Sequence, residues 1–592
     1  MSKSYQGPKF IVVSGGVMSG VGKGLATASI GKILQQYGYQ TTAIKIDPYI
    51  NYDAGTLRPT EHGEVWVTDD GGEIDQDLGN YERFLGIDLP RWNNLTTGQI
   101  YQTVIERERR GEYLGKTVQP IPHITDEIKR RIWQCAEGYE MVLVEIGGTV
   151  GDYENEIFLY ALKSIERDIG KEHMIYVLVT YLPILRHLGE MKTKPTQQAI
   201  RLLGENGIFP DFILCRGTQP LDEIRKKKIE VSANIGADYI ISNPDVQTLY
   251  SVPLDLEKEG MGKKILNKLN LKPKRSPDWT HWEKLLHTIE HPQKTVKIAM
   301  VGKYVDSGDF SFSDSYISIN QSLEHAGAAL GARVAISWID AKQLEQDESE
   351  ANLESRKVEQ LSEYDGILIP GAFGGTGSEG MLRAIRTARE HNVPFLGLCY
   401  GLHMAVVEFA RNVCGMEGAN STEIDSKTKY PVIDFQPEQR ERIKRKEYGG
   451  TMRLGAYTAI LKEDSQVLKL YKRAGRLKED ARRIAELKKD PERASHLGLL
   501  PPDGDFVLER HRHRYEVAPE FVETMERKGL VFSGYHLTSR GAKLMEFLEL
   551  PGHPYFVATQ AHPEFKSRLE KPAPLFYGFI EAALRQTDRK AS

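Results

Sequence analysis

The stretch KFIVVSGGVMSGVGKGLATASIGKILQQYG, residues 9–38, predicts the fold of the amino-terminal part of the chain. It begins with an apolar, β-branched run, continues as a glycine-rich loop and ends in a helical pattern. A second short strand pattern, QTTAIKID, follows at residues 40–47. Strand, helix and strand in this order are typical of a parallel, doubly wound α/β sheet.

The same alternation continues along the chain and then starts again. MVLVEIGG at residues 141–148 reads as a further strand, whereas residues 271–295 are polar and read as a linker. After this linker, VKIAMVGKY begins a second series of strands and helices. We therefore predict two doubly wound α/β domains, residues 1–270 and residues 296–592.

Composition excludes several classes of protein. The 592 residues include 78 basic and 82 acidic side chains, a balance that argues against a nucleic-acid-binding protein. No signal-peptide core and no stretch long enough to span a bilayer is present, so we expect a cytoplasmic protein with no membrane partner. The cysteines form no CxxC pair, which argues against a disulfide framework and a structural zinc site; they are Cys135, Cys215, Cys399 and Cys414.

The loop SGGVMSGVGKG, residues 14–24, is a candidate phosphate-binding loop. Backbone N–H groups of such a loop and of the helix N-terminus converge on a phosphate, and Lys23 adds a positive charge. The loop departs twice from the general pattern GxxxxGK[ST], because Val17 stands in place of a glycine and Gly24 in place of Ser or Thr. A tight packing turn is the alternative.

Carboxylates near the ends of predicted strands complete a candidate nucleotide site. Asp75 and Asp77 lie in GGEIDQDLGNYERF, and Glu145 ends a strand. Mg²⁺ prefers one or two such carboxylates together with phosphate oxygens. The basic loop GEMKTKPTQ, residues 189–197, is either a solvated loop or a second nucleotide-binding loop, and its spacing leaves both open.

The carboxyl-terminal half contains a candidate nucleophile in GLCYG, residues 397–401. Glycines on both sides of Cys399 suit a sharp strand-to-helix turn, and the helix N-terminus lowers the pKa of a thiol. In AHPEF, His562 and Glu564 are two residues apart, so on an extended segment both would point to one face. The glycine-rich turn IPGAFGG, residues 369–375, could stabilise an oxyanion. An inert buried cysteine is the alternative.

These motifs resemble two known families. The carboxyl-terminal half resembles the class I glutamine amidotransferases. The amino-terminal half resembles the P-loop-like (dethiobiotin-synthetase-like) synthetase domain of the CTP synthase family, through KIDPYIN, HGEVWVTDDGGEIDQDLGNYERF, VEIGGTVGD and GEMKTKPTQ. NSTE, GGTMRLG and RHRHRYEV in the second half are also like that family, and the resemblance covers about residues 8–585. It implies that ATP phosphorylates O4 of UTP and that ammonia from glutamine displaces the phosphate to give CTP.

The resemblance also implies the residues of the synthetase site. Lys23 and Lys45 would stabilise the transferred phosphoryl group, and Asp77 and Glu145 would bind Mg²⁺. ATP would contact Gly20, Val21, Gly22, Lys23, Gly24, Leu25, Asp245 and Val246. UTP would contact Ser19, Lys192, Thr193, Lys194, Pro195, Thr196, Gln197 and Lys228. CTP, as feedback inhibitor, would contact Asp152, Tyr153 and Glu154.

In the glutaminase half, the resemblance implies Cys399 as nucleophile, His562 as base and Glu564 as the group that orients it. The glutamine pocket would be formed by Ala372, Tyr400, Gly401, Leu402, His403, Glu423 and Arg514. A homotetramer, filament formation and GTP as allosteric activator are implied as well.

The chain also departs from the family pattern. Ala372 replaces a glycine of the oxyanion turn, which would be strained if that position required a positive φ, and Thr376 replaces an arginine tied to GTP activation. Tyr400, His403 and Ala561 replace a leucine, a glutamine and a phenylalanine around the nucleophile and the base. A charged segment, about residues 472–503, resembles an insertion, and its stripe of Leu477, Ile484 and Leu487 predicts a surface helix.

Two other functions fit parts of the sequence. A different ATP-dependent amidoligase, of the cobyrinate-amidating type, would also join a phosphate loop to a glutaminase, although KTKPTQ favours UTP. A filament-forming scaffold with an impaired glutaminase is the other.

Overall fold

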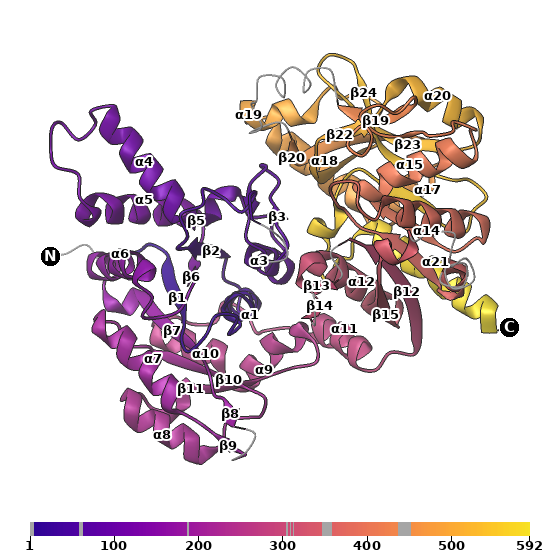
Figure 1. Ribbon diagram of the computed structural model, residues 1–592. Helices are drawn as coiled ribbons and strands as arrows, with labels where there is room; N and C mark the ends of the chain where they lie inside the picture. Colours follow the sequence, from indigo (N-terminus) through magenta and orange to yellow (C-terminus); the bar gives the residue numbers. More distant parts are fainter. Residues whose placement is uncertain are drawn as a thin grey trace. The chain divides into compact units, whose positions relative to one another are not determined.

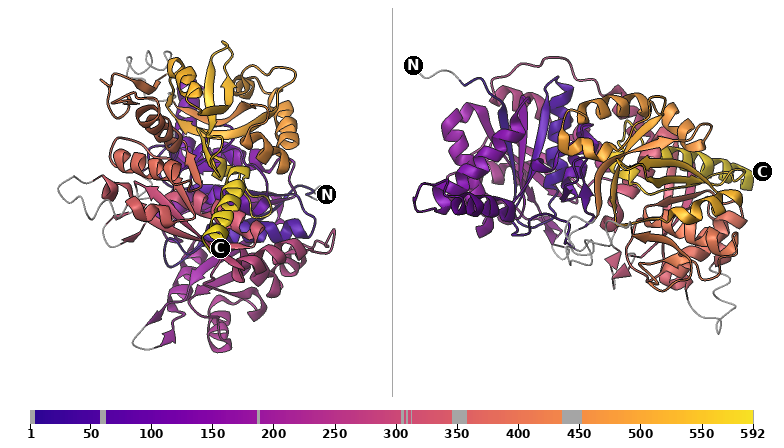
Figure 2. Two further views of the ribbon diagram at one scale, coloured as in Figure 1. Left: turned by 90° about the vertical axis from the view of Figure 1, so that its right-hand side faces the viewer. Right: turned by 90° about the horizontal axis from the view of Figure 1, so that it is seen from above.

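The computed structural model describes residues 5–57, 63–185, 189–303, 306–307, 310–311, 313–345, 358–435 and 452–591. It divides into two compact units (Figures 1 and 2). Unit 1 comprises Met1–Leu57 and Glu73–Leu286, and unit 2 comprises Arg58–Gly72 and His287–Ser592. The domain boundaries expected above stay a prediction.

Unit 1 is built on a seven-stranded sheet in which every pair of neighbouring strands is parallel. This sheet confirms the doubly wound α/β fold. Its strands, in spatial order, are β11 (Ile240–Pro244), β10 (Phe212–Gly217), β7 (Met174–Tyr181), β1 (Lys9–Gly15), β6 (Met141–Ile146), β2 (Thr41–Asp47) and β5 (Asn94–Thr96).

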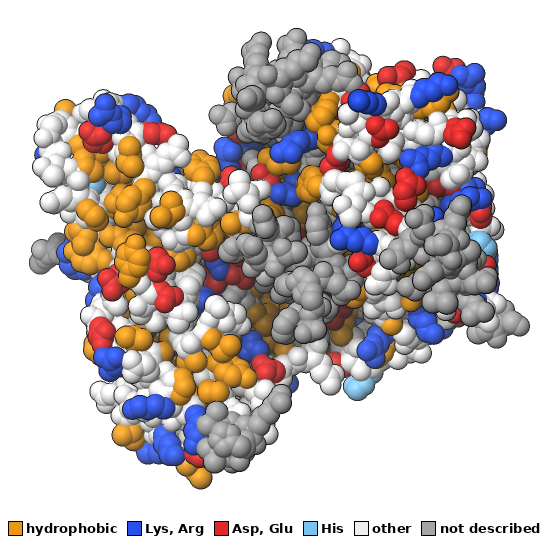
Figure 3. Space-filling model, in the orientation of Figure 1, with side chains coloured by type: hydrophobic (Ala, Val, Ile, Leu, Met, Phe, Trp, Pro, Cys, Tyr) orange, Lys and Arg blue, Asp and Glu red, His pale blue; other side chains and the backbone are white. Residues whose placement is uncertain are grey.

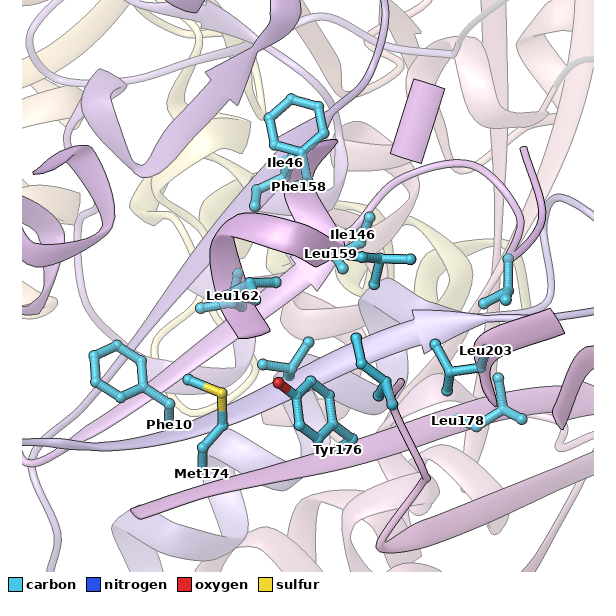
Figure 4. Close-up of a cluster of buried hydrophobic side chains, with 14 of the residues drawn as sticks. Phe10, Ile46, Ile146, Phe158, Leu159, Leu162, Met174, Tyr176, Leu178 and Leu203 are labelled. Atoms are coloured by element: carbon cyan, nitrogen blue, oxygen red, sulfur yellow. The ribbon is translucent and has the colours of Figure 1, made fainter. Parts of the chain in front are cut away.

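Helices cover both faces of this sheet (Figure 2). They are α1 (Lys23–Gln36), α3 (Asp77–Leu85), α4 (Thr97–Arg109), α5 (Thr125–Ala136), α6 (Tyr153–Ile169), α7 (Lys194–Glu205), α8 (Glu223–Ala233), α9 (Val252–Lys258) and α10 (Met261–Lys268). On one face, Phe158 and Leu162 of α6 pack against strand residues such as Ile146 and Tyr176 (Figure 4). Because β1, β6 and β2 are parallel, their carboxyl ends lie at one edge of the sheet. Ligands bind at this edge in such folds.

Within the predicted linker, α11 spans Thr280–Glu290. Its Trp282 is buried, donates a hydrogen bond from Nε1 to the Tyr250 carbonyl oxygen at 2.8 Å and packs against Phe84. The first part of this helix therefore belongs to the core of unit 1.

Unit 2 contains a nine-stranded mixed sheet. Five strands are parallel neighbours, as expected for a doubly wound domain, and the other four continue the sheet in antiparallel fashion. The parallel part is β15 (Ala332–Asp340), β12 (Lys294–Gly302), β16 (Gly366–Ile369), β17 (Phe395–Leu398) and β25 (Phe556–Thr559), and the antiparallel part is β24 (Lys543–Glu549), β23 (Val531–Leu537), β20 (Arg453–Leu461) and β21 (Phe506–His513).

The helices of unit 2 include two within the charged segment. They are α12 (Ile317–Leu330), α14 (Ser378–Glu390), α15 (Tyr400–Asn412), α17 (Gln466–Arg473), α18 (Arg476–Leu487), α19 (Pro491–Ala494), α20 (Pro519–Arg527) and α21 (Pro574–Ala591). The predicted apolar stripe is confirmed, because Ile484 and Leu487 are buried and Leu477 is half-buried. In addition to this apolar stripe, α18 buries the charged side chain of Arg476, whose guanidinium lies 2.9 Å from Glu509.

Across the described ranges, we find no helix with both the length and the apolar character needed to cross a membrane.

Candidate active sites

The phosphate loop joins β1 to α1 through several residues with positive φ. Gly20 and Gly22 have φ of 71° and 88°, and Val17 has φ of 80°. Val17 thus adopts the conformation that glycine favours, at the position where the general pattern has glycine, at a cost of about 1–3 kcal/mol. A Cβ at Gly24 would lie 2.1 Å from Asp77 Oδ1, which explains why Ser or Thr is absent there.

Next to this loop lies a buried cluster of lysines and carboxylates. Lys45, near the end of β2, donates to Glu145 Oε1 at 2.9 Å and forms an ion pair with Asp77 at the start of α3. Tyr81 donates to the other Glu145 oxygen. Lys23 Nζ donates to the Gly148 carbonyl oxygen at 2.7 Å. The structure therefore brings together the predicted phosphoryl-binding lysines and the predicted metal carboxylates.

Negative charge exceeds positive charge in this cluster. Burial and the neighbouring carboxylates of Asp47 and Asp77 raise the pKa of Asp75 to about 7, against the effect of Lys45. Burial alone would lower the pKa of Lys45, but Asp77 and Glu145 raise it well above its usual value. Additional positive charge would stabilise the ionised carboxylates, so the cluster fits a divalent cation.

The described residues contain no group of three or more His, Cys, Asp or Glu side chains arranged to hold a metal ion. Mg²⁺ commonly takes only one or two protein carboxylates and completes its shell with water and phosphate oxygens. Asp77 and Glu145 fit this kind of site, in which the nucleotide supplies the remaining ligands.

The other predicted nucleotide contacts fall into three places. Asp245 accepts a hydrogen bond at 2.7 Å from Arg216, whose guanidinium abuts Gly22 of the phosphate loop. Gln197 and Lys228 line a cavity of about 740 Å³, and Tyr153 and Glu154 line another of about 1130 Å³. Of the remaining predicted residues, Ser19 lies in the loop before α1, and Val21 and Leu25 are buried beside that loop. Val246 follows Asp245, and Asp152 precedes α6. The residues that lead into α7 or begin it are Lys192, Thr193, Lys194, Pro195 and Thr196.

In unit 2, Cys399 occupies the sharp turn between β17 and α15. Its φ of 50° and ψ of −97° are unusual for a residue with a side chain. A Cβ at Gly397 would lie 2.9 Å from the Ala558 Cβ, and one at Gly401 would lie 2.4 Å from the Ile369 carbonyl oxygen. Both glycines are therefore required by close packing around the nucleophile turn.

His562 lies between Glu564 and the cysteine. Its Nδ1 is 2.7 Å from Glu564 Oε1, through a 3₁₀ turn over Pro563–Lys566 and not through the extended segment that we expected. Burial alone would lower the pKa of His562, but Glu564 and Cys399 raise it to about 10. A Cβ at Gly371 would lie 2.9 Å from the His562 ring and 3.7 Å from the Cys399 Cβ, so all three groups surround one point.

The oxyanion turn is held by Tyr400 and Glu423. Its positive φ falls on Gly374 (78°) and not on Ala372, so alanine is not strained there. The Tyr400 hydroxyl donates to the Gly374 carbonyl oxygen, and Glu423 accepts from the Gly374 N–H, both at 2.8 Å. Lys303 lies 4.0 Å over the Tyr400 ring. Tyr400 therefore stabilises the turn through its hydroxyl group.

His403 reaches the nucleophile through Gln560. Its Nε2 is 2.8 Å from Gln560 Oε1, and Gln560 Nε2 is 3.7 Å from Cys399 Sγ. Burial lowers the pKa of His403 to about 4, so its ring is neutral at neutral pH. On the other side of the pocket, burial raises the pKa of Glu423, opposed by Lys303 and Arg514. Within the described residues, the buried Arg514 Nε has no hydrogen-bond partner, which suits a carboxylate ligand.

Comparison with known proteins identifies both halves of the chain. The family model described as CTP synthase N-terminus matches residues 9–271, and that described as Glutamine amidotransferase class-I matches residues 311–582. A CTP synthase of Pyrococcus abyssi is 49% identical over 582 residues, covering 98% of this chain and 99% of that protein. One from Methanocaldococcus jannaschii is 49% identical over 576 residues, covering 97% and 98%.

The chain belongs to the CTP synthase family. It is a glutamine-dependent ligase, and its reaction is the ATP-dependent amination of UTP in pyrimidine nucleotide synthesis. Among solved structures, the glutaminase domain of Trypanosoma brucei CTPS with bound acivicin is 31% identical, over 49% of this chain and 94% of that chain, with a TM-score of 0.40.

Several residues that the structure places in these sites of the CTP synthase were not predicted from the sequence. Asp47 ends the same strand as Lys45, and Gln560 lies two residues before His562, so position along the chain could have indicated both. Tyr81 and Lys303 lie in stretches quoted above, but neither they nor Arg216 stood out as site residues. Their contacts with Glu145, Asp245 and Tyr400 arise only from folding.

Proposed function

We propose that Lys23, Lys45, Asp77 and Glu145 perform the synthetase step and that Cys399, His562 and Glu564 release the ammonia. The observation that carries this proposal is the presence of two buried ionic clusters in one chain, one in each unit. In one cluster Lys45 joins Asp77 and Glu145, and in the other Glu564 holds His562 beside Cys399.

In the synthetase step, the phosphate loop and Lys23 would hold the ATP phosphates, and Lys45 would neutralise charge on the phosphoryl group as it passes to O4 of UTP. Asp77 and Glu145 would hold Mg²⁺, which supplies positive charge to the phosphate oxygens when bound. Ammonia then replaces the phosphate at C4 to give CTP.

In the glutaminase step, the Cys399 thiolate would attack the amide carbon of glutamine. The His562 imidazolium, stabilised by Glu564, would donate its proton to the departing ammonia and leave a thioester. Neutral His562 would then remove a proton from the water that hydrolyses the thioester. Glu423 and Arg514 would bind the amino and carboxylate groups of glutamine.

The remaining ligands are proposals as well. CTP as feedback inhibitor would contact Asp152, Tyr153 and Glu154 at the start of α6. GTP as activator would act near Thr376, which is exposed next to the oxyanion turn. The nucleotide substrates favour a cytoplasmic location.

An apolar surface of unit 1 supports the proposed homotetramer. Figure 3 shows hydrophobic side chains gathered over α4, α5 and α6. Ile50 and Tyr153 are 82% and 81% exposed, and both line the cavity of about 1130 Å³. Surfaces of this kind commonly mark protein–protein contacts. Sedimentation of the protein with and without UTP and ATP measures its oligomeric state, and a monomer at all concentrations would contradict the tetramer.

The experiment that tests the proposed function is CTP formation from UTP and Mg-ATP. Nitrogen is supplied either as ammonium chloride or as glutamine, each with and without GTP. We expect CTP from both sources. Product from ammonia alone would show that the glutaminase half does not work as proposed. No CTP from either source, in folded protein, would contradict the proposed roles of Lys23, Lys45, Asp77 and Glu145. The GTP arms measure whether Thr376 supports activation.

A further inference from the structure

Residues 63–72 come from the amino-terminal half of the sequence but are built into unit 2. They include the short strand β3 (Trp66–Val67), and Trp66 is completely buried. The Ala456 N–H donates to the Asp69 carbonyl oxygen at 2.9 Å. A Cβ at Gly455 would lie 2.6 Å from the Gly71 nitrogen, so the two backbones are in close contact. The segment is thus a packed part of the glutaminase unit.

One side chain of this segment reaches the catalytic histidine through an aromatic stack. The Trp66 ring lies 5.0 Å from the Phe565 ring, centroid to centroid. Phe565 stacks in turn on His562, at 5.2 Å and an interplanar angle of 20°. Such contacts restrict rotation of the rings they join. Trp66 therefore contacts the ring that stacks on His562.

A second path runs through a buried ion pair. Asp69 Oδ1 accepts a hydrogen bond from Arg510 Nε at 2.6 Å, and both side chains are almost completely buried. The Arg510 carbonyl oxygen accepts the His562 N–H at 2.8 Å. Although burial alone would raise the pKa of Asp69, Lys566, Arg510 and Arg483 hold it well below its usual value. Asp69 is therefore ionised. It binds Arg510, the β21 residue whose carbonyl oxygen accepts the His562 N–H.

The charged segment also forms ion pairs with residues 63–72. Arg483 of α18 lies 3.6 Å from Asp69 Oδ2, and Arg493 of α19 lies 3.3 Å from Asp70 Oδ2. The segment that resembles an insertion thus contacts two neighbouring acids of residues 63–72. Of these two acids, Asp69 is the one that binds Arg510 through the ion pair described above.

We propose that Asp69 and Trp66 are positioning residues of the glutaminase, which hold His562 in place through Arg510 and Phe565. The inference rests on the proposed role of His562 as the catalytic acid and base. A positioning residue affects how often the base is correctly placed, and so it changes kcat more than the KM for glutamine. Synthesis from ammonia does not need His562 and should be unaffected.

The test compares Asp69→Asn with Asp70→Asn, which is the same change at the next residue and spares the Arg510 contact. Glutamine hydrolysis and CTP synthesis from ammonia are measured, together with the rate of Cys399 alkylation by iodoacetamide between pH 6 and pH 10. For Asp69→Asn we expect kcat for glutamine to fall about tenfold or more, with KM within about twofold, and slower alkylation. Asp70→Asn and synthesis from ammonia should stay within about twofold of the unmodified protein.

Equal losses in both variants, or an Asp69→Asn enzyme with unchanged kcat and alkylation, would overturn the proposal. If Asp69→Asn does not fold, Trp66→Phe and Trp66→Leu decide the question. Trp66→Phe keeps an aromatic ring against Phe565 and should retain most of kcat, whereas Trp66→Leu should lose it. Equal kcat in these two would also overturn the proposal.

His562→Ala is measured in parallel. If it still hydrolyses glutamine, the proposed function itself fails, and this outcome is distinct from any result with Asp69 or Trp66.

Discussion

The two active-site clusters bury charge in different ways. In unit 1, the carboxylates of Asp47, Asp75, Asp77 and Glu145 lie around Lys45 and Lys23, and the pKa of Asp75 is raised to about 7 because burial and the neighbouring carboxylates outweigh the effect of Lys45. In unit 2, Glu564 and His562 satisfy each other, and the pKa of His562 is raised to about 10. The first cluster is suited to receive charged ligands, whereas the second is organised before glutamine arrives.

Because of this difference, activity of the glutaminase cluster should depend on its own few side chains, whereas activity of the synthetase cluster should depend on the ligands that bind to it. Preorganised groups lower the barrier because they need no rearrangement during the reaction. Substitutions in the two units should therefore separate the two nitrogen sources.

The largest effect is expected from Cys399→Ser. Loss of the thiolate should reduce glutamine-dependent CTP formation by about a thousandfold or more, because serine is a far weaker nucleophile in this turn. Synthesis from ammonia should stay within about twofold of the unmodified protein. Cys414→Ser, at a half-buried cysteine of the same unit, is the matched control. An equal loss of CTP synthesis from ammonia would show that the two units do not act separately.

Glu145→Gln should act on both nitrogen sources. Removing this carboxylate takes away a partner of Lys45 and a proposed metal ligand, so CTP formation should fall about a hundredfold or more from ammonia and from glutamine alike. Basal glutamine hydrolysis should persist. Glu166→Gln, at another buried glutamate of unit 1, serves as control. Normal CTP synthesis by Glu145→Gln would remove the residue from the site.

Glu564→Gln should change the pH dependence of glutamine hydrolysis. Glu564 stabilises the imidazolium, so the raised pKa of about 10 keeps His562 protonated through neutral pH. Without it, the pKa falls and the alkaline limb of the kcat profile should move down by about one pH unit or more. The exposed Glu520 gives the control Glu520→Gln. An unmoved alkaline limb would show that Glu564 does not set this pKa.

The smallest effect is expected from His403→Gln, on stability. The folded pKa of His403 is about 4, below its usual 6.5, so the unfolded chain binds the proton more tightly. Its contribution to stability is present above pH 6.5 and is lost as the pH falls toward 4. The variant should therefore gain about 2 kcal/mol relative to the unmodified protein between pH 8 and pH 5.

The difference in Tm between the two proteins, measured at both pH values, tests this expectation. His291→Gln, at an exposed histidine, should show no such gain. A Tm difference for His403→Gln that is the same at pH 5 and pH 8 would show that His403 does not titrate as expected.

The two α/β sheets, the strand–loop–helix turns and the candidate nucleophile with its partners could all be predicted from the sequence. Alternation of short apolar strands with helices is a local pattern, and so are GLCYG and HPE, because the residues that form each turn are neighbours in the chain. The structure confirms the sheets and brings Cys399, His562 and Glu564 together.

Contacts between segments far apart in the chain could not be predicted from local sequence patterns. Gly24 is a glycine because Asp77, more than fifty residues later, occupies its side-chain space. Ala372 is tolerated because the positive φ falls on Gly374, and Tyr400 supports the same turn through its hydroxyl group. Asp69 reaches Arg510, 441 residues away along the chain. These contacts depend on packing between distant segments, since burial and charge at a residue are set by neighbours in space and not in sequence.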